Sequence, residues 1–307
     1  MERYYDLVII GAGPAGMSAA IYGSRAGLST LMLEMGAPGG KLIKTNEISN
    51  WPGIQKVNGA ELASQMFAHA TSFGAEYAYG EVTSIQVDGD EKRVVCSDGT
   101  IYTGKAVIIA SGTVERMLGI PGEAENVGRG VSYCAVCDGA FFRDQEVAVI
   151  GGGNSALEEA LYLTQFAKKV TIVIRRDIFR AEAHVQKQIE ENEKIEIIRR
   201  HVPVRILDDG MKVNGIVLRD VDSGDEQTLE ASGIFPYIGQ DPAVSFLQGL
   251  DVLDEKGYMI VDANGETACK GIYGAGDVIA KPLRQVVTAA NDGAIAAQHA
   301  FHEIRGI

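Results

Sequence analysis

The chain contains the same local pattern twice, and this repetition restricts the possible folds more than any other feature. A short apolar run leads into the glycine-rich turn GAGPAG at residues 11–16, and another leads into GGGNSA at residues 151–156. Helical spacing and a further apolar run follow each turn. A strand, a glycine turn, a helix and a second strand form the dinucleotide-binding unit of a doubly wound α/β sheet. The sequence therefore predicts an α/β protein with two nucleotide-binding units.

In the first turn, three glycines have separate roles. Gly11 permits the tight turn, Gly13 lets the backbone approach a pyrophosphate, and Gly16 lets the helix pack closely on the strand. Glu34 directly follows the apolar run at residues 30–33, where its carboxylate would accept hydrogen bonds from a ribose diol. We therefore expect a dinucleotide at this turn, and these residues alone do not distinguish FAD from NAD.

The second unit differs at the position that would contact the ribose. The apolar run at residues 170–174 is followed by Arg175 and Arg176, with Arg180 one turn further on. A carboxylate there would repel a 2′-phosphate, whereas guanidinium groups bind a phosphate through paired hydrogen bonds. These arginines predict NADPH in preference to NADH at the second turn. A solvated basic turn is the alternative.

A pair of cysteines lies between the two turns. Cys134 and Cys137 are separated by two residues, and Asp138 follows them. This spacing allows a short-loop disulfide to open and close, and the adjacent carboxylate would take or give the proton that each step requires. Half of a zinc site or two buried thiols are the alternatives, but zinc prefers four ligands, and the remaining cysteines, Cys96 and Cys269, are isolated in the sequence. We therefore predict a redox-active dithiol and no metal.

Two nucleotide sites on either side of a dithiol indicate a chain of electron carriers. One nucleotide must be a flavin, because a dithiol does not readily take a hydride directly from nicotinamide. This assigns FAD to the first unit. The segments at residues 106–112 and 271–278 end in small residues that would let the backbone approach FAD, and a helix from about 284 to 305 would direct its N-terminal amides toward the flavin.

Length, charge and the N-terminus narrow the class of protein. A chain of 307 residues suggests about two domains. The net charge of −13 argues against nucleic acid or an anionic membrane as the main partner. The sequence has no apolar run as long as a membrane span, and its start does not have the architecture of a signal peptide, so we expect a cytoplasmic protein.

Other segments predict the remaining secondary structure. Residues 59–73 have the spacing of an amphipathic helix, and alternating segments at 81–88 and 93–97 predict a β-meander. Residues 212–220 and 226–237 each predict a strand.

In this order, these motifs resemble those of the low-molecular-weight bacterial thioredoxin reductases, and the resemblance extends over essentially the whole chain. The segments that carry it are residues 11–16, 50–53, 134–139, 151–156, 175–181, 274–278 and 284–285. The resemblance implies two Rossmann-like three-layer domains: an FAD domain formed by residues 1–114 and 243–307, and an NADPH domain at 115–242 inserted into it. It also implies a homodimer and a thioredoxin or thioredoxin-like partner.

The same resemblance implies roles for individual residues. Cys134 would attack the thioredoxin disulfide, Cys137 would lie nearer the flavin, and Asp138 would serve as acid and base. The candidate FAD residues are Gly11, Gly13, Pro14, Ala15, Gly16, Glu34, Gly40, Lys41, Asn50, Ala110, Ser111, Gly112, Gly276, Asp277, Arg284, Gln285 and Val286. The candidate NADPH residues are Gly151, Gly153, Asn154, Ser155, Ala156, Arg175, Arg176 and Arg180.

The sequence departs from the family pattern at three positions. Ile174 stands where a histidine usually precedes the arginine pair, a change that would weaken NADPH binding. Lys41 stands where many members carry glutamine near the flavin, and Ser111 replaces a common threonine.

Three other functions compete with this one. Ferredoxin-driven relatives keep the flavin and the dithiol but lose NADPH recognition, and only Ile174 points toward them. Flavoprotein ferredoxin–NADP reductases of similar architecture lack the dithiol. A non-catalytic nucleotide-binding redox sensor would bind nucleotide without turnover and would not need Asp138.

Overall fold

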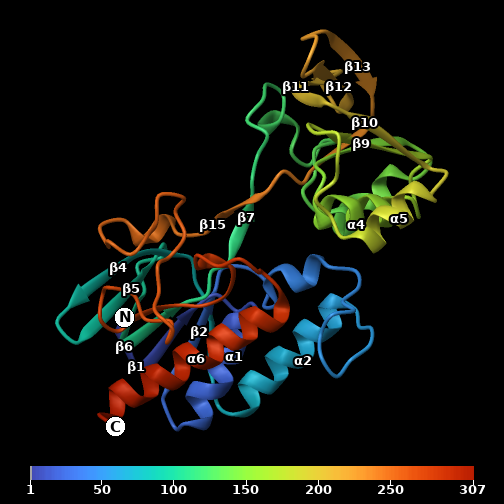
Figure 1. Ribbon diagram of the computed structural model, residues 1–307. Helices are drawn as coiled ribbons and strands as arrows, with labels where there is room; N and C mark the ends of the chain where they lie inside the picture. The colour runs from blue at the N-terminus through green and yellow to red at the C-terminus, as the bar shows by residue number, and fades with distance from the viewer. Residues whose placement is uncertain (1) are drawn as a thin grey trace. The chain divides into compact units, whose positions relative to one another are not determined.

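The computed structural model describes residues 2–307, and the chain divides into two compact units (Figure 1). The first unit contains the residues up to 114 together with residues 241–307, and the second contains residues 115–240. The chain therefore leaves the first unit once and returns to it once. The two crossings are short strands, β7 (Thr113–Glu115) and β15 (Gln240–Pro242), which pair with each other.

The first unit is built on a mixed sheet whose central strands are parallel. Its strand order is β3 (Glu76–Tyr79), β2 (Thr30–Glu34), β1 (Glu2–Ile10), β6 (Ile101–Ile109), β5 (Glu91–Cys96) and β4 (Val82–Asp88), and β16 (Ile272–Gly274) pairs with the end of β6. β4, β5 and β6 pair antiparallel, as the meander prediction requires. Successive residues of β1 enter different cores: Leu7 and Ile9 pack on one face, and Val8 and Ile10 on the other. A strand covered on both faces has to be apolar throughout, which explains the uninterrupted run.

Three helices belong to this unit: α1 (Pro14–Arg25), α2 (Gly59–Ser72) and α6 (Val286–Arg305). Figure 1 shows α1 and α6 side by side, and their buried alanines share a core with Leu7 and Ile9. The meander and the segment around residues 244–261 contribute to the core on the opposite face. The sheet therefore has helices on one face and strands and loops on the other.

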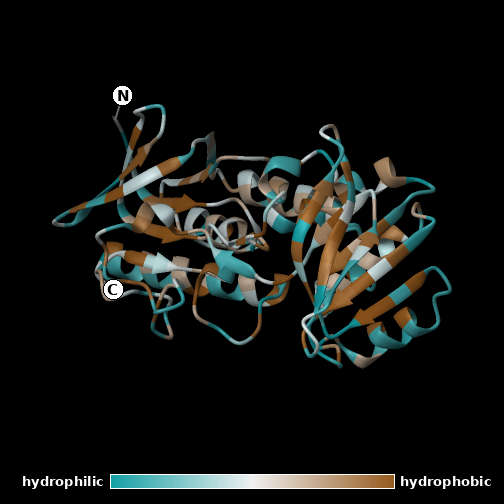
Figure 2. Ribbon diagram, turned by 90° about the horizontal axis from the view of Figure 1, so that it is seen from above, coloured by the Kyte–Doolittle hydropathy of each residue, from teal (hydrophilic) through white to brown (hydrophobic). Residues whose placement is uncertain are grey.

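The second unit has three layers. A parallel sheet has the order β10 (Ile195–Arg199), β9 (Lys169–Ile174), β8 (Glu146–Ile150) and β14 (Gly233–Pro236). The helices α4 (Asn154–Leu163) and α5 (Ala183–Glu190) belong to the core on one face. The antiparallel sheet of β11 (His201–Asp208), β12 (Val213–Asp220) and β13 (Glu226–Glu230) belongs to the core on the other face. Figure 2 shows hydrophobic residues concentrated on strands of the molecule.

One element was predicted wrongly. The segment at residues 226–237 is not one strand, because the chain changes sheets after Glu230. Its first half is exposed and pairs with β12, whereas Ile234 and Phe235 are fully buried beside β8. At the start of the second half, a side chain on Gly233 would lie 2.6 Å from the Phe142 ring, so tertiary packing decides where the strand begins.

The remaining elements are short. They are the helix α3 (Ala135–Asp138) and the 3₁₀ turns η1 (Gly40–Lys44), η2 (Ala124–Asn126), η3 (Gly139–Phe142), η4 (Ser245–Leu247) and η5 (Gly276–Val278). Across residues 2–307, the structure contains no helix with the length and apolar character needed to span a membrane.

Candidate functional site

The two closely spaced cysteines form a disulfide bond. Cys134 and Cys137 are joined at opposite ends of the first turn of α3, with their Cα atoms 5.3 Å apart. Cys134 is the N-cap of this helix, and its Sγ accepts a hydrogen bond from the Cys137 amide at 3.1 Å. Cys134 is half-buried and Cys137 is exposed. The disulfide therefore lies at the surface of the second unit, open to a reaction partner.

Asp138 is connected to Cys134 through a serine that the sequence analysis did not identify. The buried Ser132 hydroxyl donates to Asp138 Oδ2 at 2.6 Å and accepts from the Cys134 amide at 3.1 Å. The carboxylate of Asp138 is thus held by a hydroxyl group that lies two residues before Cys134. A serine at this spacing is a common local hydrogen-bonding pattern, so the sequence held only a weak signal for it.

Two tyrosines hold the backbone on either side of Cys134. The Tyr133 hydroxyl donates to Glu123 Oε1 at 2.7 Å, and the Tyr237 hydroxyl accepts from the Ala135 amide at 3.0 Å. Burial, and then Glu123, raises the pKa of Tyr133, while burial followed by Glu159 raises the pKa of Tyr237. The raised pKa of Tyr133 favours the protonated hydroxyl, which is the form that donates to Glu123.

The first glycine turn has no room for side chains at two positions. A Cβ on Gly11 would lie 2.4 Å from the Ala110 carbonyl oxygen, and one on Gly16 would lie 1.9 Å from the Gly11 oxygen. Gly11 also has φ 105°, a left-handed value that favours glycine. Gly13 is the N-cap of α1, Pro14 is the first helical residue, and within residues 2–307 no side chain caps this end. The free amides at this helix start suit an anionic diphosphate such as that of FAD.

Glu34 lies at the carboxyl end of β2 beside this turn. Its Oε2 accepts from the Ala12 amide and its Oε1 from the Gly36 amide, both at 2.9 Å. Each oxygen has a second lone pair, so the arrangement leaves acceptor capacity for a ribose hydroxyl. The predicted role of Glu34 is compatible with these contacts.

The structure brings distant candidate FAD residues together. The Asn50 side chain donates to Gln285 Oε1 at 2.9 Å across 235 residues of sequence. Gln285 is the N-cap of α6, and Val286 is its first residue. Arg284 donates to the carbonyl oxygen of Asp277 at 3.2 Å.

Other candidates in this unit also contact residues far away in the sequence. The Lys41 ammonium donates to the Thr113 hydroxyl, and Ser111 donates to the Ala243 carbonyl oxygen at 2.7 Å. Gly40 approaches the first turn, with its Cα 3.9 Å from where a Cβ on Gly13 would lie.

A buried ion pair that contacts the candidate residue Gly276 was not predicted. Asp292 on α6 accepts from the Gly276 amide at 3.1 Å and from the Lys281 ammonium at 2.5 Å. Both charged side chains are largely buried. Nothing at the spacing of Lys281 and Asp292 distinguishes them in the sequence from an exposed pair.

The second glycine turn repeats the tight geometry of the first. A Cβ on Gly151 would lie 2.2 Å from the backbone carbonyl oxygen of Tyr237, whereas Gly153 faces open space. Gly153 is the N-cap of α4, again without a side-chain cap among the described residues. Asn154 Oδ1 accepts from the Glu182 amide at 2.8 Å, Ser155 is exposed, and the other candidate, Ala156, is buried. The open helix start suits a second diphosphate.

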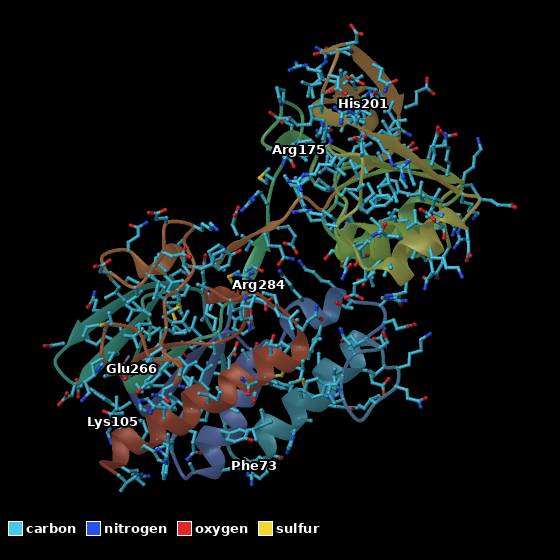
Figure 3. The ribbon with its side chains drawn as sticks, in the orientation of Figure 1. Phe73, Lys105, Arg175, His201, Glu266 and Arg284 are labelled. Carbon is cyan, nitrogen blue, oxygen red and sulfur yellow. A yellow bond between two sulfur atoms is a disulfide. The ribbon has the colours of Figure 1, made fainter. Side chains whose placement is uncertain are left out.

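The three arginines lie beyond the carboxyl end of β9. All are exposed, and Figure 3 labels Arg175. The Arg180 amide donates to the Gly152 oxygen at 2.7 Å, which ties this segment to the glycine turn. Ile174 is buried at 3% exposure, so its side chain belongs to the core and the arginines supply the exposed charge.

The other two cysteines are separate from this site. Cys96 is buried in the core of the first unit and Cys269 is partly buried, and both are free thiols. Nowhere in residues 2–307 do three or more His, Cys, Asp or Glu side chains gather as a metal site would require.

Known proteins share this combination of folds and motifs. The family model described as pyridine nucleotide-disulphide oxidoreductase matches residues 5–293. A thioredoxin reductase of Bacillus subtilis is 48% identical over 303 residues, covering 99% of this chain and 96% of the relative. The crystal structure of Lactococcus lactis thioredoxin reductase has a TM-score of 0.96 and 47% identity, covering 99% of this chain and all of the other. A ferredoxin-flavin thioredoxin reductase of Clostridium acetobutylicum has 29% identity and a TM-score of 0.56, with full coverage of both chains.

These matches define the class of protein first and then the branch. The fold class is confirmed: two nucleotide-binding α/β domains, as in the solved relatives. The chain belongs to the pyridine nucleotide-disulphide oxidoreductase family, in the branch that contains these bacterial thioredoxin reductases.

Proposed function

We propose that this protein is an NADPH-dependent thioredoxin-disulfide reductase. The observation that carries the proposal is the surface Cys134–Cys137 disulfide with Asp138 beside it, in a chain that also has two glycine turns suited to dinucleotides. The naming of the relatives supports the same activity. FAD would bind at the first turn and NADPH at the second.

The chemistry that FAD supplies when bound is the passage of an electron pair between NADPH and the disulfide. In the resulting dithiol, the Cys134 sulfur attacks one sulfur of the thioredoxin disulfide, and the other leaves as a thiolate. The Cys137 sulfur then attacks Cys134, which releases the second thioredoxin thiolate and re-forms the internal disulfide. Asp138, held by Ser132, gives and takes the protons of these steps.

Arg175, Arg176 and Arg180 would select NADPH by binding its 2′-phosphate. Their exposure beside an uncapped helix start supports this assignment, and the burial of Ile174 leaves all three guanidinium groups accessible. These arginines and the lower identity to the ferredoxin-flavin relative disfavour a ferredoxin-driven reaction. A homodimer in the cytoplasm that uses a thioredoxin-like partner completes the proposal.

An anaerobic absorbance experiment tests the relay. Addition of NADPH to the FAD-loaded protein should bleach the flavin much faster than NADH does, and oxidised thioredoxin should then restore the yellow colour. The variants Cys134→Ser and Cys137→Ser should still be bleached by NADPH but should fail to reduce thioredoxin. Thioredoxin reduction by either variant would sink the dithiol assignment, and a flavin that neither nucleotide bleaches would move the electron donor to ferredoxin.

A further inference from the structure

The segment that carries the exposed arginines also carries an acid. Asp177 lies between Arg176 and Arg180, and its side chain is 61% exposed. A free carboxylate at this position would repel the phosphate that the neighbouring guanidinium groups attract. The arrangement of Asp177 therefore affects the net field at the anion site.

Arg200 forms an ion pair with this acid. Arg200 Nη1 lies 2.8 Å from Asp177 Oδ2, and the other side of the same guanidinium group forms a two-point contact with the carboxylate of Asp222. Arg199 donates from Nε to the Asp177 carbonyl oxygen at 3.0 Å, and its guanidinium carbon lies 5.7 Å from the centre of the Phe179 ring. Both the side chain and the backbone of Asp177 are thus held by arginines outside its own segment.

Strand pairing explains why these arginines reach Asp177. β9 and β10 are parallel, with Arg199 in register with Ile174, so the residues after each strand emerge at the same sheet edge. Arg200 is the single residue between β10 and β11, and Figure 3 labels its neighbour His201. Its backbone has φ 57°, in the left-handed region that L-residues adopt at a cost. The Arg200 oxygen accepts from the Val221 amide at 2.7 Å, which fixes this conformation beside Asp222.

We propose that Arg200 is a positioning and specificity-determining residue for the 2′-phosphate of NADPH. It neutralises Asp177 and, together with Arg199, holds residues 175–180 so that Arg175, Arg176 and Arg180 face the phosphate. This inference rests on the proposed function of those three arginines. The competing explanation is that Arg200 only stabilises the local fold. Exposed ion pairs such as those of Arg200 add little to the free energy of unfolding. A structural role would affect the binding of any nucleotide, whereas the proposed role would affect only ligands with a 2′-phosphate.

Isothermal titration calorimetry with two probes and the FAD-loaded protein distinguishes the specificity role of Arg200 from a structural role. Adenosine 2′,5′-bisphosphate and 5′-AMP differ only in the 2′-phosphate. Arg200→Gln should weaken the bisphosphate roughly tenfold, the size of one partly screened charge interaction, and should leave 5′-AMP nearly unchanged. The loss should shrink at high salt because the groups are exposed. Equal losses for both probes would overturn the inference in favour of a structural role.

A second substitution tests the charge argument. Adding Asp177→Asn to Arg200→Gln should recover most of the lost bisphosphate affinity, because the unneutralised carboxylate is then removed. Arg219→Gln is the matched control: Arg219 pairs with Glu226 at 2.8 Å, is similarly exposed, and its loss changes the net charge equally. Arg219→Gln should keep the wild-type preference; an equal loss there, or no recovery in the double variant, would refute the specific role of Arg200.

The outcomes also distinguish this inference from the function it rests on. A wild-type protein that binds both probes equally would refute the 2′-phosphate role of Arg175, Arg176 and Arg180. A wild-type protein that prefers the bisphosphate, together with an Arg200→Gln variant that keeps the full preference, would refute only the role of Arg200.

Discussion

Glu123 and Glu159, two carboxyl groups of the second unit, differ in how their oxygens are satisfied. Glu123 accepts from the amides of Leu118 and Gly119 and from the Tyr133 hydroxyl, at 2.7–2.8 Å. Glu159 on α4 has a buried Oε2 with no hydrogen-bond partner. Burial raises the pKa of the Glu159 carboxyl to about 7, and Glu158 adds to the rise. The charge of Glu159 is therefore disfavoured in the folded protein.

This predicts a pH-dependent stability that Glu159→Gln removes. The folded pKa of about 7 lies above the ordinary value of 4.5, so the folded state binds more protons between these pH values and loses stability as pH rises through them. The loss is on the order of 3 kcal/mol in full. Glu159→Gln should therefore raise the thermal unfolding midpoint relative to wild type at pH 8, with little difference at pH 4.5.

Calorimetric scans at the two pH values check this prediction. Glu193→Gln is a suitable control, because Glu193 is an exposed glutamate of the same unit. Glu158→Gln should show a smaller effect of the same sign as Glu159→Gln, because Glu158 adds to the raised pKa of Glu159 and burial raises its own pKa. A Glu159→Gln variant with the same midpoint difference at both pH values would show that Glu159 does not titrate in this range.

The sequence predicted the proposed reacting residues but not the groups that contact them. Cys134, Cys137 and Asp138 lie within five residues of one another, in a short motif whose spacing has chemical meaning. Tyr237 accepts a hydrogen bond from the Ala135 amide, 102 residues away in the sequence, and Arg200 donates to Asp177, 23 residues away. Such contacts depend on strand order and register, which local pattern does not determine.

At the scale of elements, two helices of the first unit pack so closely that one of them needs a glycine at the contact. α6 crosses α1 at Gly293, where a Cβ would lie 2.0 Å from the Ala15 oxygen. α1 begins at the glycine turn, so this crossing also holds the proposed diphosphate site. The sequence predicted both helices but gave no sign that they pack on each other, because the contact joins the two ends of the chain.

Gly293→Ala should therefore destabilise the protein although it improves helix propensity. The propensity gain is about 1 kcal/mol, but overpacking against backbone costs about 1–3 kcal/mol and shifts the start of α1. Unfolding in urea should show a net loss, and fluorescence titration of the apoprotein should show weaker FAD binding. Asn291→Ala, at an exposed position of the same helix, should lose neither; equal behaviour of the two variants would contradict the packing argument.

At the scale of the whole molecule, each unit has its own hydrophobic core. The five core clusters found among residues 2–307 each draw their members from one unit only. The second unit is also continuous in sequence, whereas the first is assembled from both ends of the chain. The glycine turns predicted the two sheets, and the resemblance to the family predicted the insertion, since no local pattern marks a return to an earlier sheet.

These observations predict that residues 115–240 fold as an independent protein. All four strands of the parallel sheet, all three of the antiparallel sheet and both cores are contained in the fragment, so both sheets and their cores stay complete on excision. The fragment should unfold cooperatively, contain the Cys134–Cys137 disulfide and bind adenosine 2′,5′-bisphosphate with an affinity close to that of the whole protein, but should not bind FAD. A fragment that starts at residue 146 is the control: it lacks α3 and Phe142, which packs against Phe235 with ring centres 5.3 Å apart, and should be less stable. Circular dichroism measures the unfolding of each fragment, and calorimetry measures the binding of the bisphosphate. A 115–240 fragment that remains unfolded would show that its core depends on the rest of the chain.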